Sequence, residues 1–285
     1  MNLEEVEKVG KIASNSIVNA DCLEAMKYIA DKSIDCIIAD LPFGITACNW
    51  DSVIPFEPLW EQYKRIIKPN GAIVLFGSQP FTSALVMSNP KWFKYEWIWE
   101  KQYGSNFASF KYQPSKEHEN ILVFGDGRVN FYPIRRMRTE LSLKRDPIGS
   151  SRIKKHSKWD KKTVSHTGIK TVDHQISVDG KRNAGSTIKF NYDKNRGIHP
   201  TQKPVKLLEY LIKTYSVENE LILDNTAGSG SLAIAAINTN RNYICIEKDD
   251  HYFEVMSERI ANHDPNAPAK KSKPKRVPKG QLELF

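Results

Sequence analysis

The chain has 285 residues, 40% of them hydrophobic and 10% aromatic, which suits a globular protein with one sizeable α/β domain and an insertion. The formal net charge of +9 favours a polyanionic partner, usually nucleic acid, although a basic protein without a special partner has the same balance. The four cysteines lack C-x-x-C spacing, the first residues lack an apolar signal core and no apolar run reaches membrane-spanning length. We therefore expect a cytoplasmic protein without a disulfide framework, a zinc site or a membrane anchor.

Short β-branched runs alternate with longer amphipathic segments, which is the pattern of a parallel sheet covered by helices. Strands are expected at 17–19, 36–39, 72–76, 96–101, 120–124, 221–223 and 243–246. The fourth and fifth of these runs form a candidate antiparallel pair. Helices are expected at 22–30, 59–67, 204–212 and 231–238. The third helix has Thr201 as its candidate N-cap and Pro204 in its first turn.

Composition divides the chain into four parts. Residues 1–127 and 199–262 carry the strand and helix patterns, whereas residues 128–198 are an expected insertion and residues 263–285 an expected flexible basic tail. Within residues 151–196, twelve Lys and Arg stand against four Asp and Glu. A solvated loop is one explanation, but an insertion that binds nucleic acid explains the sign of the charge better.

A glycine-bearing turn joins a strand to a helix at residues 224–231, Asp-Asn-Thr-Ala-Gly-Ser-Gly-Ser. Gly228 and Gly230 let the backbone pass close to a ligand. Glu247 ends the next strand about twenty residues later, where a Rossmann-like unit places an acid on ribose hydroxyls. The full G-x-G-x-x-G pattern is missing, so a ligand with a ribose but no pyrophosphate fits better, and S-adenosylmethionine is the candidate. The alternative is a tight turn followed by a surface glutamate.

The tetrapeptide Asp40-Leu41-Pro42-Phe43 follows the buried run 36–39, so it falls at the carboxyl edge of the expected sheet, where ligands bind. It suits methylation of an amine conjugated to a ring, whose nitrogen is a poor nucleophile. The Asp40 carboxylate and the Leu41 carbonyl would accept the two N–H groups and so orient the lone pair. Pro42 would stiffen the turn, and Phe43 would stack on an extruded base. Taken alone, the tetrapeptide is also compatible with an ordinary turn.

These motifs resemble those of the amino-methylating DNA methyltransferases, whose catalytic motif is Asp/Asn/Ser-Pro-Pro-Tyr/Phe. The tetrapeptide precedes the glycine turn, which is the permuted order of that family's beta class, and the basic insertion falls between them, where that class has its target-recognition region. The resemblance spans about residues 15–262. It includes Asn-Ala-Asp-Cys-Leu at 19–23, Gly-Ser-Gln-Pro-Phe at 77–81 and His-Pro-Thr-Gln-Lys-Pro at 199–204.

The resemblance implies an α/β fold with a Rossmann-like, seven-stranded, mostly parallel sheet, and S-adenosylmethionine as the cofactor. It implies Asp21 near the cofactor adenine and Glu247 on the ribose, with Thr201 and Lys203 near the methionine end. The complete set of expected cofactor-binding residues is Asp21, Cys22, Thr201, Lys203, Asp224, Ala227, Gly228, Gly230 and Glu247. Asp at position 40 resembles the adenine-N6 enzymes, whereas Ser is typical of the cytosine-N4 enzymes.

The expected function is transfer of a methyl group to N6 of a flipped adenine in duplex DNA. Cytosine-N4 methylation, methylation of RNA or of a protein amide, and a DNA-binding protein with a decayed methyltransferase site are the alternatives. Two positions depart from the family pattern, because Leu41 replaces the first proline and Asn225-Thr226-Ala227 replaces the commoner Pro-Phe pairing. A zinc-protease motif at His118-Glu119 is rejected because H-E-x-x-H requires His at 122, and no metal site is expected.

The final peptide, Gln281-Leu282-Glu283-Leu284-Phe285, resembles the Q-L-x-L-F peptide by which bacterial replication proteins dock on the sliding clamp. Leu284 and Phe285 would fill an apolar pocket while Gln281 hydrogen-bonds at its rim, and the Lys- and Pro-rich tail would act as a tether. A five-residue match also arises by chance. A homodimer is a further expectation, because dimers are frequent in the beta class, but no sequence feature identifies an interface.

Overall fold

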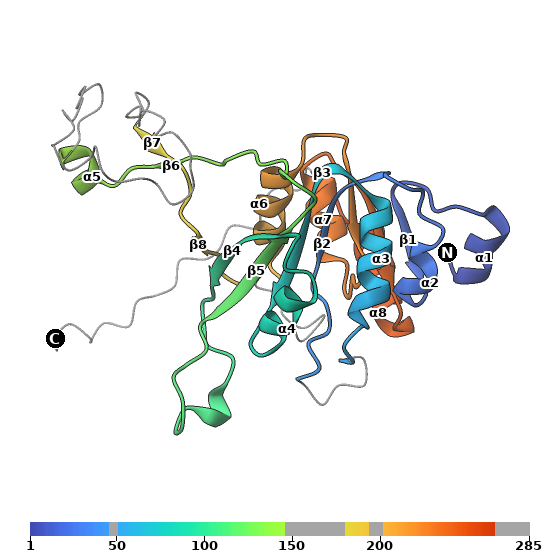
Figure 1. The fold of residues 1–285 in the computed structure, drawn as a ribbon, viewed down its shortest axis with the longest axis horizontal. Coiled ribbons are helices and arrows are strands. Elements are labelled where there is room, and N and C mark those ends of the chain that lie inside the picture. Colours follow the sequence, from blue (N-terminus) through green and yellow to red (C-terminus); the bar gives the residue numbers. More distant parts are fainter. Residues whose placement is uncertain (46–50, 146–179, 194–201, 266–285) are drawn as a thin grey trace.

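The structure, a computed structural model, describes residues 1–45, 51–145, 180–193 and 202–265. A central sheet carries helices on both faces, which gives three layers (Figure 1). This arrangement confirms the expected α/β class. Among the described helices, none has the length and apolar character needed to cross a bilayer.

Eight described strands make up the central sheet, in the order β1-β10-β9-β2-β3-β5-β4-β8. Their bounds are β1 Ser16–Asn19, β2 Ile34–Ala39, β3 Ile67–Gly77, β4 Phe93–Glu100, β5 His118–Phe124, β8 Thr187–Lys189, β9 Leu221–Asp224 and β10 Asn242–Glu247. The seven expected strands are all present, and β5 runs antiparallel to both β3 and β4, as the candidate pair predicted. The expected number of strands was one too few. The extra strand, β8, pairs with β4 in parallel and comes from within residues 128–198.

Helices α2, α3, α6 and α7 are the four that the sequence predicted. The described helices are α1 Leu3–Val9, α2 Cys22–Met26, α3 Phe56–Ile66, α4 Phe81–Ser88, α5 Glu140–Arg145, α6 Val205–Tyr215, α7 Ser231–Asn238 and α8 Asp250–Ala261, with a short 3-10 turn η1 at Phe107–Ser109. Helix α2 ends at Met26 rather than near residue 30. Helix α6 has Pro204 at its N-cap, so the expectation of an N-cap at Thr201 was wrong. Its first amide, that of Val205, donates to the carboxylate of Asp193 instead (3.0 Å).

The core lies on both faces of the sheet, because neighbouring residues of a strand point to opposite faces. In β2, Ile37 and Ala39 join the apolar cluster under α2, α3 and α4. Cys36 and Ile38 join the cluster under α6 and α7. Strand β3 repeats this alternation. Strands buried on both faces in this way are typical of parallel sheets between two helical layers.

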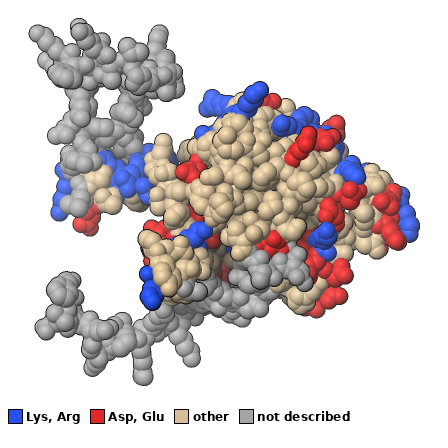
Figure 2. Space-filling view, turned by 60° about the horizontal axis from the view of Figure 1, so that its bottom comes forward, with Lys and Arg blue, Asp and Glu red and all other residues tan. Residues whose placement is uncertain are grey.

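A projecting arm leaves the sheet between β5 and β8 and contains helix α5 and a two-stranded ribbon, β6 (Arg136–Met137) and β7 (Lys181–Arg182), seen at the upper left of Figure 1. The side chains of Arg136, Lys181 and Arg182 are exposed. Figure 2 shows Lys and Arg gathered on this arm. Most of the basic stretch predicted to bind nucleic acid, residues 146–179, lies outside the described part of the chain.

Candidate active site

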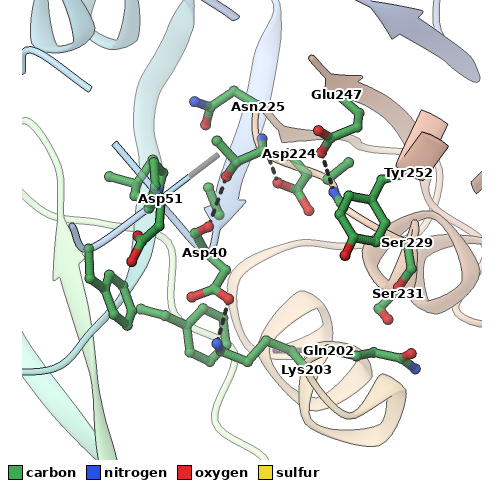
Figure 3. A pocket seen from close by; sticks show the side chains of 18 of the residues that line it. Asp40, Asp51, Gln202, Lys203, Asp224, Asn225, Ser229, Ser231, Glu247 and Tyr252 are labelled. Carbon is green, nitrogen blue, oxygen red and sulfur yellow. Dashed lines mark hydrogen bonds and ion pairs between the residues drawn. The ribbon is translucent and has the colours of Figure 1, made fainter. Parts of the chain in front are cut away.

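The candidate site lies where the connections of the sheet change direction. From β2 the chain continues through α3 to β3 on one side, and from β9 it continues through α7 to β10 on the other side. Since β2 and β9 are parallel neighbours, this reversal leaves a crevice outside their carboxyl ends. A cavity of about 1180 Å³ opens there. Its walls include Asp40 after β2, Asp224 at the end of β9 and Glu247 at the end of β10 (Figure 3).

The glycine turn forms one wall of this cavity. The Glu247 carboxylate accepts hydrogen bonds from the backbone N–H of Gly228 (2.6 Å) and of Asp249 (2.9 Å). Gly230 has a φ of 75°, and a Cβ there would lie 2.6 Å from Cγ of Met256 on α8. The turn therefore requires glycine at position 230 both for its backbone conformation and for its close approach to α8.

Asp224 lies between Asp40 and Glu247 in Figure 3 and is buried. Burial raises the pKa of Asp224 to about 8, although the N–H of Thr226 donates to its carboxylate at 3.1 Å. The Asp224 carboxyl is therefore largely protonated at neutral pH. The next residue, Asn225, accepts a hydrogen bond from the Tyr63 hydroxyl of α3 at 2.6 Å, which ties the turn to the opposite layer.

Asp21 and Cys22 lie at the start of α2, at the Glu247 end of the cavity. Asp21 caps this helix by accepting from the N–H of Leu23 (3.0 Å) and forms an exposed ion pair with Lys248 (3.2 Å). Burial raises the pKa of the Cys22 thiol to about 11, so Cys22 lines the pocket as an apolar group at neutral pH.

The tetrapeptide at residues 40–43 forms the other end of the cavity. The Asp40 carbonyl accepts a hydrogen bond from the hydroxyl of Thr226 (3.1 Å), which joins it to the glycine turn. Leu41 is only 3% exposed, so the residue that replaces the family's first proline anchors the turn in the core. The Phe43 ring packs against Phe81, with ring centroids 5.0 Å apart.

The Asp40 carboxylate has two differently placed oxygens. Its Oδ2 accepts a hydrogen bond from the ammonium of Lys203, as Figure 3 shows. Its Oδ1 is buried and has no hydrogen-bond partner in the described chain. Because an unsatisfied buried acceptor is costly, Oδ1 is available for a donor that enters the cavity.

Lys203 belongs to a buried charge network that the sequence did not reveal. Its ammonium also lies 3.4 Å from Glu119 on β5, and Glu119 in turn pairs with Lys101 at 3.2 Å. The side chains of Lys203, Lys101 and Glu119 are 9%, 1% and 15% exposed, so solvent screens this network little. Two cations and two carboxylates, counting Asp40, balance one another in the floor of the cavity.

The pKa values of the network follow from burial opposed by charge. Burial raises the pKa of Asp40 to about 6, against the opposing effect of the Lys203 ammonium. Burial acts to lower the pKa of Lys203, but the Asp40 and Glu119 carboxylates outweigh it and that pKa is raised. Burial acts to raise the pKa of Glu119, but Lys203 and Lys101 outweigh it and that pKa is lowered. Asp40 is therefore largely ionised at neutral pH and becomes protonated in mild acid.

A further acid that the sequence analysis missed, Asp51, orders the chain after the tetrapeptide. Its carboxylate accepts the backbone N–H of Gly44 (2.8 Å) and of Ile45 (2.9 Å). Figure 3 places Asp51 beside Asp40 in the same cavity. No motif marks Asp51, because its partners are backbone groups whose position depends on the folded loop.

The expected site residues meet in this one cavity, with two exceptions. The other eleven line it: Asp40, Leu41, Pro42, Phe43, Asp21, Cys22, Lys203, Asp224, Ala227, Gly228 and Glu247. Gly230 lies behind the turn against Met256. Thr201 lies outside the described residues. The Lys203 ammonium pairs with Asp40 and Glu119, at the end of the cavity that the tetrapeptide forms.

Comparison with known families agrees with this geometry. Residues 34–258 match the N6/N4 methyltransferase family, described as DNA methylase. The chain belongs to this DNA methylase family. The resemblance noted in the order of the motifs is thereby confirmed, and the methylase is an enzyme of the N6/N4 DNA methyltransferase type.

Curated relatives of this DNA methylase include Type II methyltransferases. It is 25% identical to M.HinfI of Haemophilus influenzae over 279 residues, which cover 88% of this chain and 70% of the relative. It is 26% identical to M1.MboII of Moraxella bovis over 260 residues, which cover 84% of this chain and 93% of the relative.

Solved structures with the same fold include the M1.HpyAVI–SAM complex, which has a TM-score of 0.55 and 20% identity and covers 86% of this chain and 98% of its own. The cytosine-N4-specific PvuII DNA methyltransferase has a TM-score of 0.59 and 13% identity, with 90% of each chain covered. These likenesses confirm the methylase fold.

Proposed function

We propose that this DNA methylase transfers the methyl group of S-adenosylmethionine to the N6 amino group of a flipped adenine in duplex DNA. The observation that carries the proposal is the buried, unpartnered Oδ1 of Asp40. With Oδ2 held by Lys203, this oxygen is the acceptor that an exocyclic amino group requires. An amino-nitrogen substrate fits the site better than a hydroxyl or a carbon, because it presents two donors to acceptors on one short turn.

The cofactor is S-adenosylmethionine, which supplies an electrophilic methyl group on a sulfonium when it is bound. The residues around the glycine turn fit it. Glu247 is oriented by two backbone N–H groups and would accept from ribose hydroxyls, while Asp21 and Cys22 would hold the adenine. Lys203, at the catalytic end of the same cavity, would face the methionine end.

The chemistry assigned to this chain's residues is orientation of the nitrogen and removal of a proton. Asp40 Oδ1 and the Leu41 carbonyl would accept the two N–H groups, so that the nitrogen lone pair faces the methyl donor. Phe43 is held by Phe81 and would stack on the base after it leaves the duplex. The methylated nitrogen is acidic, so an Asp40 with a pKa of about 6 is basic enough to take its proton.

Adenine is proposed rather than cytosine because the motif begins with Asp. A cytosine-N4 product is the alternative, since the family contains enzymes such as the cytosine-N4-specific PvuII methyltransferase. The test is to incubate unmethylated phage DNA with labelled cofactor, digest it to nucleosides and identify the labelled nucleoside. Labelled N6-methyldeoxyadenosine supports the proposal, and labelled N4-methyldeoxycytidine overturns it. Parallel reactions with RNA and with protein substrates separate the remaining alternatives.

The basic arm is proposed as a DNA-binding element. Its two strands contain the exposed Arg136, Lys181 and Arg182 and no Asp or Glu. Phosphate contacts release counterions, so the logarithm of DNA affinity should fall linearly and steeply with the logarithm of salt concentration. Fluorescence anisotropy of a labelled duplex measures this slope, and a flat response would contradict the assignment.

Two further partners are proposed on sequence grounds. The terminal peptide at 281–285 would dock on the bacterial sliding clamp, and a pull-down with the chain truncated after Gly280 tests this, since unchanged binding would refute it. A homodimer is also proposed, and sedimentation of the intact chain distinguishes it from a monomer. The peptide lies outside the described residues.

A further inference from the structure

A second surface at the mouth of the cavity has no role in the chemistry described so far. The hairpin of residues 101–117 connects β4 to β5 and extends downward in Figure 1, on the side where the chain leaves β2. Residues at its base, including Tyr103, Ser105 and Phe107, line the cavity together with Asp40. The basic arm lies at the upper left in the same view, away from this hairpin. The hairpin therefore reaches out from the end of the cavity where Asp40 lies.

Hydrogen bonds between its two arms hold the base of the hairpin in place. The N–H of Lys101 donates to the Glu117 carbonyl (2.7 Å), and the Asn106 side chain bridges the two arms by donating to the Pro114 carbonyl (2.9 Å) and accepting from the Lys116 N–H (2.7 Å). The buried ammonium of Lys101 donates to Ser105 at 2.9 Å. This ammonium also belongs to the charge network under Asp40, so the hairpin is anchored to the catalytic floor.

The hairpin exposes aromatic rings along its length. Tyr112 is 82% exposed, Phe107 67%, Tyr103 52% and Phe110 45%. Phe107 and Phe110 pack against each other with ring centroids 5.2 Å apart, which leaves their outer faces to solvent. Such a cluster of exposed large rings is costly in a soluble protein and marks a surface that a partner covers.

Charge identifies the class of partner. The hairpin contains three lysines, Lys101, Lys111 and Lys116, and one acid, Glu117, where it joins β5, so that no Asp or Glu lies among the rings at residues 103–112. The Lys111 ammonium lies 5.7 Å from the centroid of the Tyr112 ring. Aromatic rings interleaved with cations and free of carboxylates suit nucleic acid, because bases stack on the rings while the cations meet phosphates.

We propose that the exposed rings of this hairpin, Phe107 and Tyr112 foremost, enter the duplex beside the target base and stack on the bases that the flipped base leaves behind. The inference rests on the proposed function, since it requires a base to be extruded into the cavity. Flipping loses stacking in the duplex, and rings that fill the gap recover part of the loss. The hairpin couples this insertion to the active site through Lys101 and Glu119.

The test compares three variants of the full chain on a short duplex that contains the sequence methylated by the wild type, as read from phage DNA. The first combines Phe107→Ala with Tyr112→Ala, and the second combines Phe107→Tyr with Tyr112→Phe, which keeps both rings. The third, Met87→Ala, removes an apolar side chain that is 71% exposed on α4. Calorimetry with S-adenosylmethionine verifies that each variant keeps an intact cavity.

Removing both rings should lower kcat/KM for the duplex by about 10-fold or more, because one stacked ring contributes about that much. The ring-preserving pair and Met87→Ala should stay within about two-fold of the wild type. A duplex with a mismatch at the target base should restore most of the lost rate, since that base is already partly unstacked. With 2-aminopurine placed beside the target and paired with thymine, the wild type should quench its fluorescence and the alanine pair should not.

Three results would overturn the inference. The first is an alanine pair with wild-type rate and wild-type quenching. The second is loss of self-association in sedimentation without a change in DNA methylation, which would make the hairpin an interface between copies of the chain. The third is absence of DNA methylation by the wild type. This result would refute the proposed function as well, and it differs from the first two because it appears in the unmutated protein.

Discussion

Lys203 should set the ionisation of Asp40, and Lys203→Met tests this directly. Methionine keeps most of the side-chain volume and removes the ammonium that contacts Asp40 and lies 3.4 Å from Glu119. Two unit charges about 4 Å apart at an effective dielectric constant of about 20 interact by about 4 kcal/mol, which corresponds to roughly three pKa units. The pKa of Asp40, about 6 in the native chain, should therefore rise to about 9 in the variant.

The expected change in rate follows from the ionised fraction. Near pH 7.5 about 97% of Asp40 is ionised at a pKa of about 6 and about 3% at a pKa of about 9, so the methyl-transfer rate should fall by roughly 30-fold. Raising the pH should restore activity to the variant, because a higher pH ionises Asp40 without the help of the Lys203 ammonium. Removing one partner of a buried ion pair also destabilises the fold by about 3–5 kcal/mol, so the assays must be run well below the melting temperature of the variant.

Single-turnover rates over a pH series, with cofactor and DNA saturating, measure the shift. Lys206→Met is the matched control, because Lys206 lies three residues further along the chain, in the first turn of α6, but its side chain is 73% exposed and forms an ion pair with Glu209 outside the cavity network. A Lys203→Met variant with an unchanged pH profile, or one equally inactive at every pH, would refute the assigned role.

Three further outcomes test the site. Asp40→Ala should lower methyl transfer by about 1000-fold or more while the calorimetric affinity for S-adenosylmethionine changes little, and loss of both together would show that Asp40 has another role. Glu247→Gln should weaken cofactor binding by about 10-fold, because charge-assisted hydrogen bonds become neutral, and an unchanged dissociation constant would contradict its placement. Gly230→Ala should lower the free energy of unfolding by about 3 kcal/mol, because strain at positive φ adds to a close contact with Met256. Gly10→Ala is the control: Gly10 has a φ of 74° but open space around it, so the loss should be about 1 kcal/mol. Equal losses in denaturant unfolding would refute the packing argument.

Much of the fold was predictable because the central strands are short apolar runs bounded by turn residues. The runs at 36–39 and 221–223 became β2 and β9, and the rule that parallel strands share a carboxyl edge placed Asp40 beside the glycine turn. Strand β8 was not predictable, because only Ile188 of its three residues is buried and three residues show no period. Helix α4 also escaped prediction, since it buries Phe81, Thr82 and Leu85 without the polar face that marks an amphipathic helix.

The buried charge network around Asp40 could not be predicted from the sequence, for a different reason. Lys203 and Asp40 are 163 positions apart, and no spacing rule links an ammonium on one segment to a carboxylate on another. Glu119 was considered only as part of a protease motif. The available signal was an acid two residues before the apolar run of β5, on the same face as the buried Ile121 and Val123. A charge at such a position requires a partner, and the fold supplies Lys101 and Lys203.

The pairing of β2 with β9 has a consequence for how the chain is made. Asp40 and Thr226, at the ends of these strands, are 186 positions apart, so a ribosome that adds about 5–20 residues per second needs on the order of 10–40 s to reach the second after the first. During that interval β2 can pair with β3, but its other edge has no native partner and is open to pairing with other chains. The centre of the sheet, where the substrate is proposed to bind, thus closes only after β9 at residues 221–224 has been made. The yield of active enzyme in a cell therefore depends on what protects the edge of β2 while the rest of the chain is synthesised.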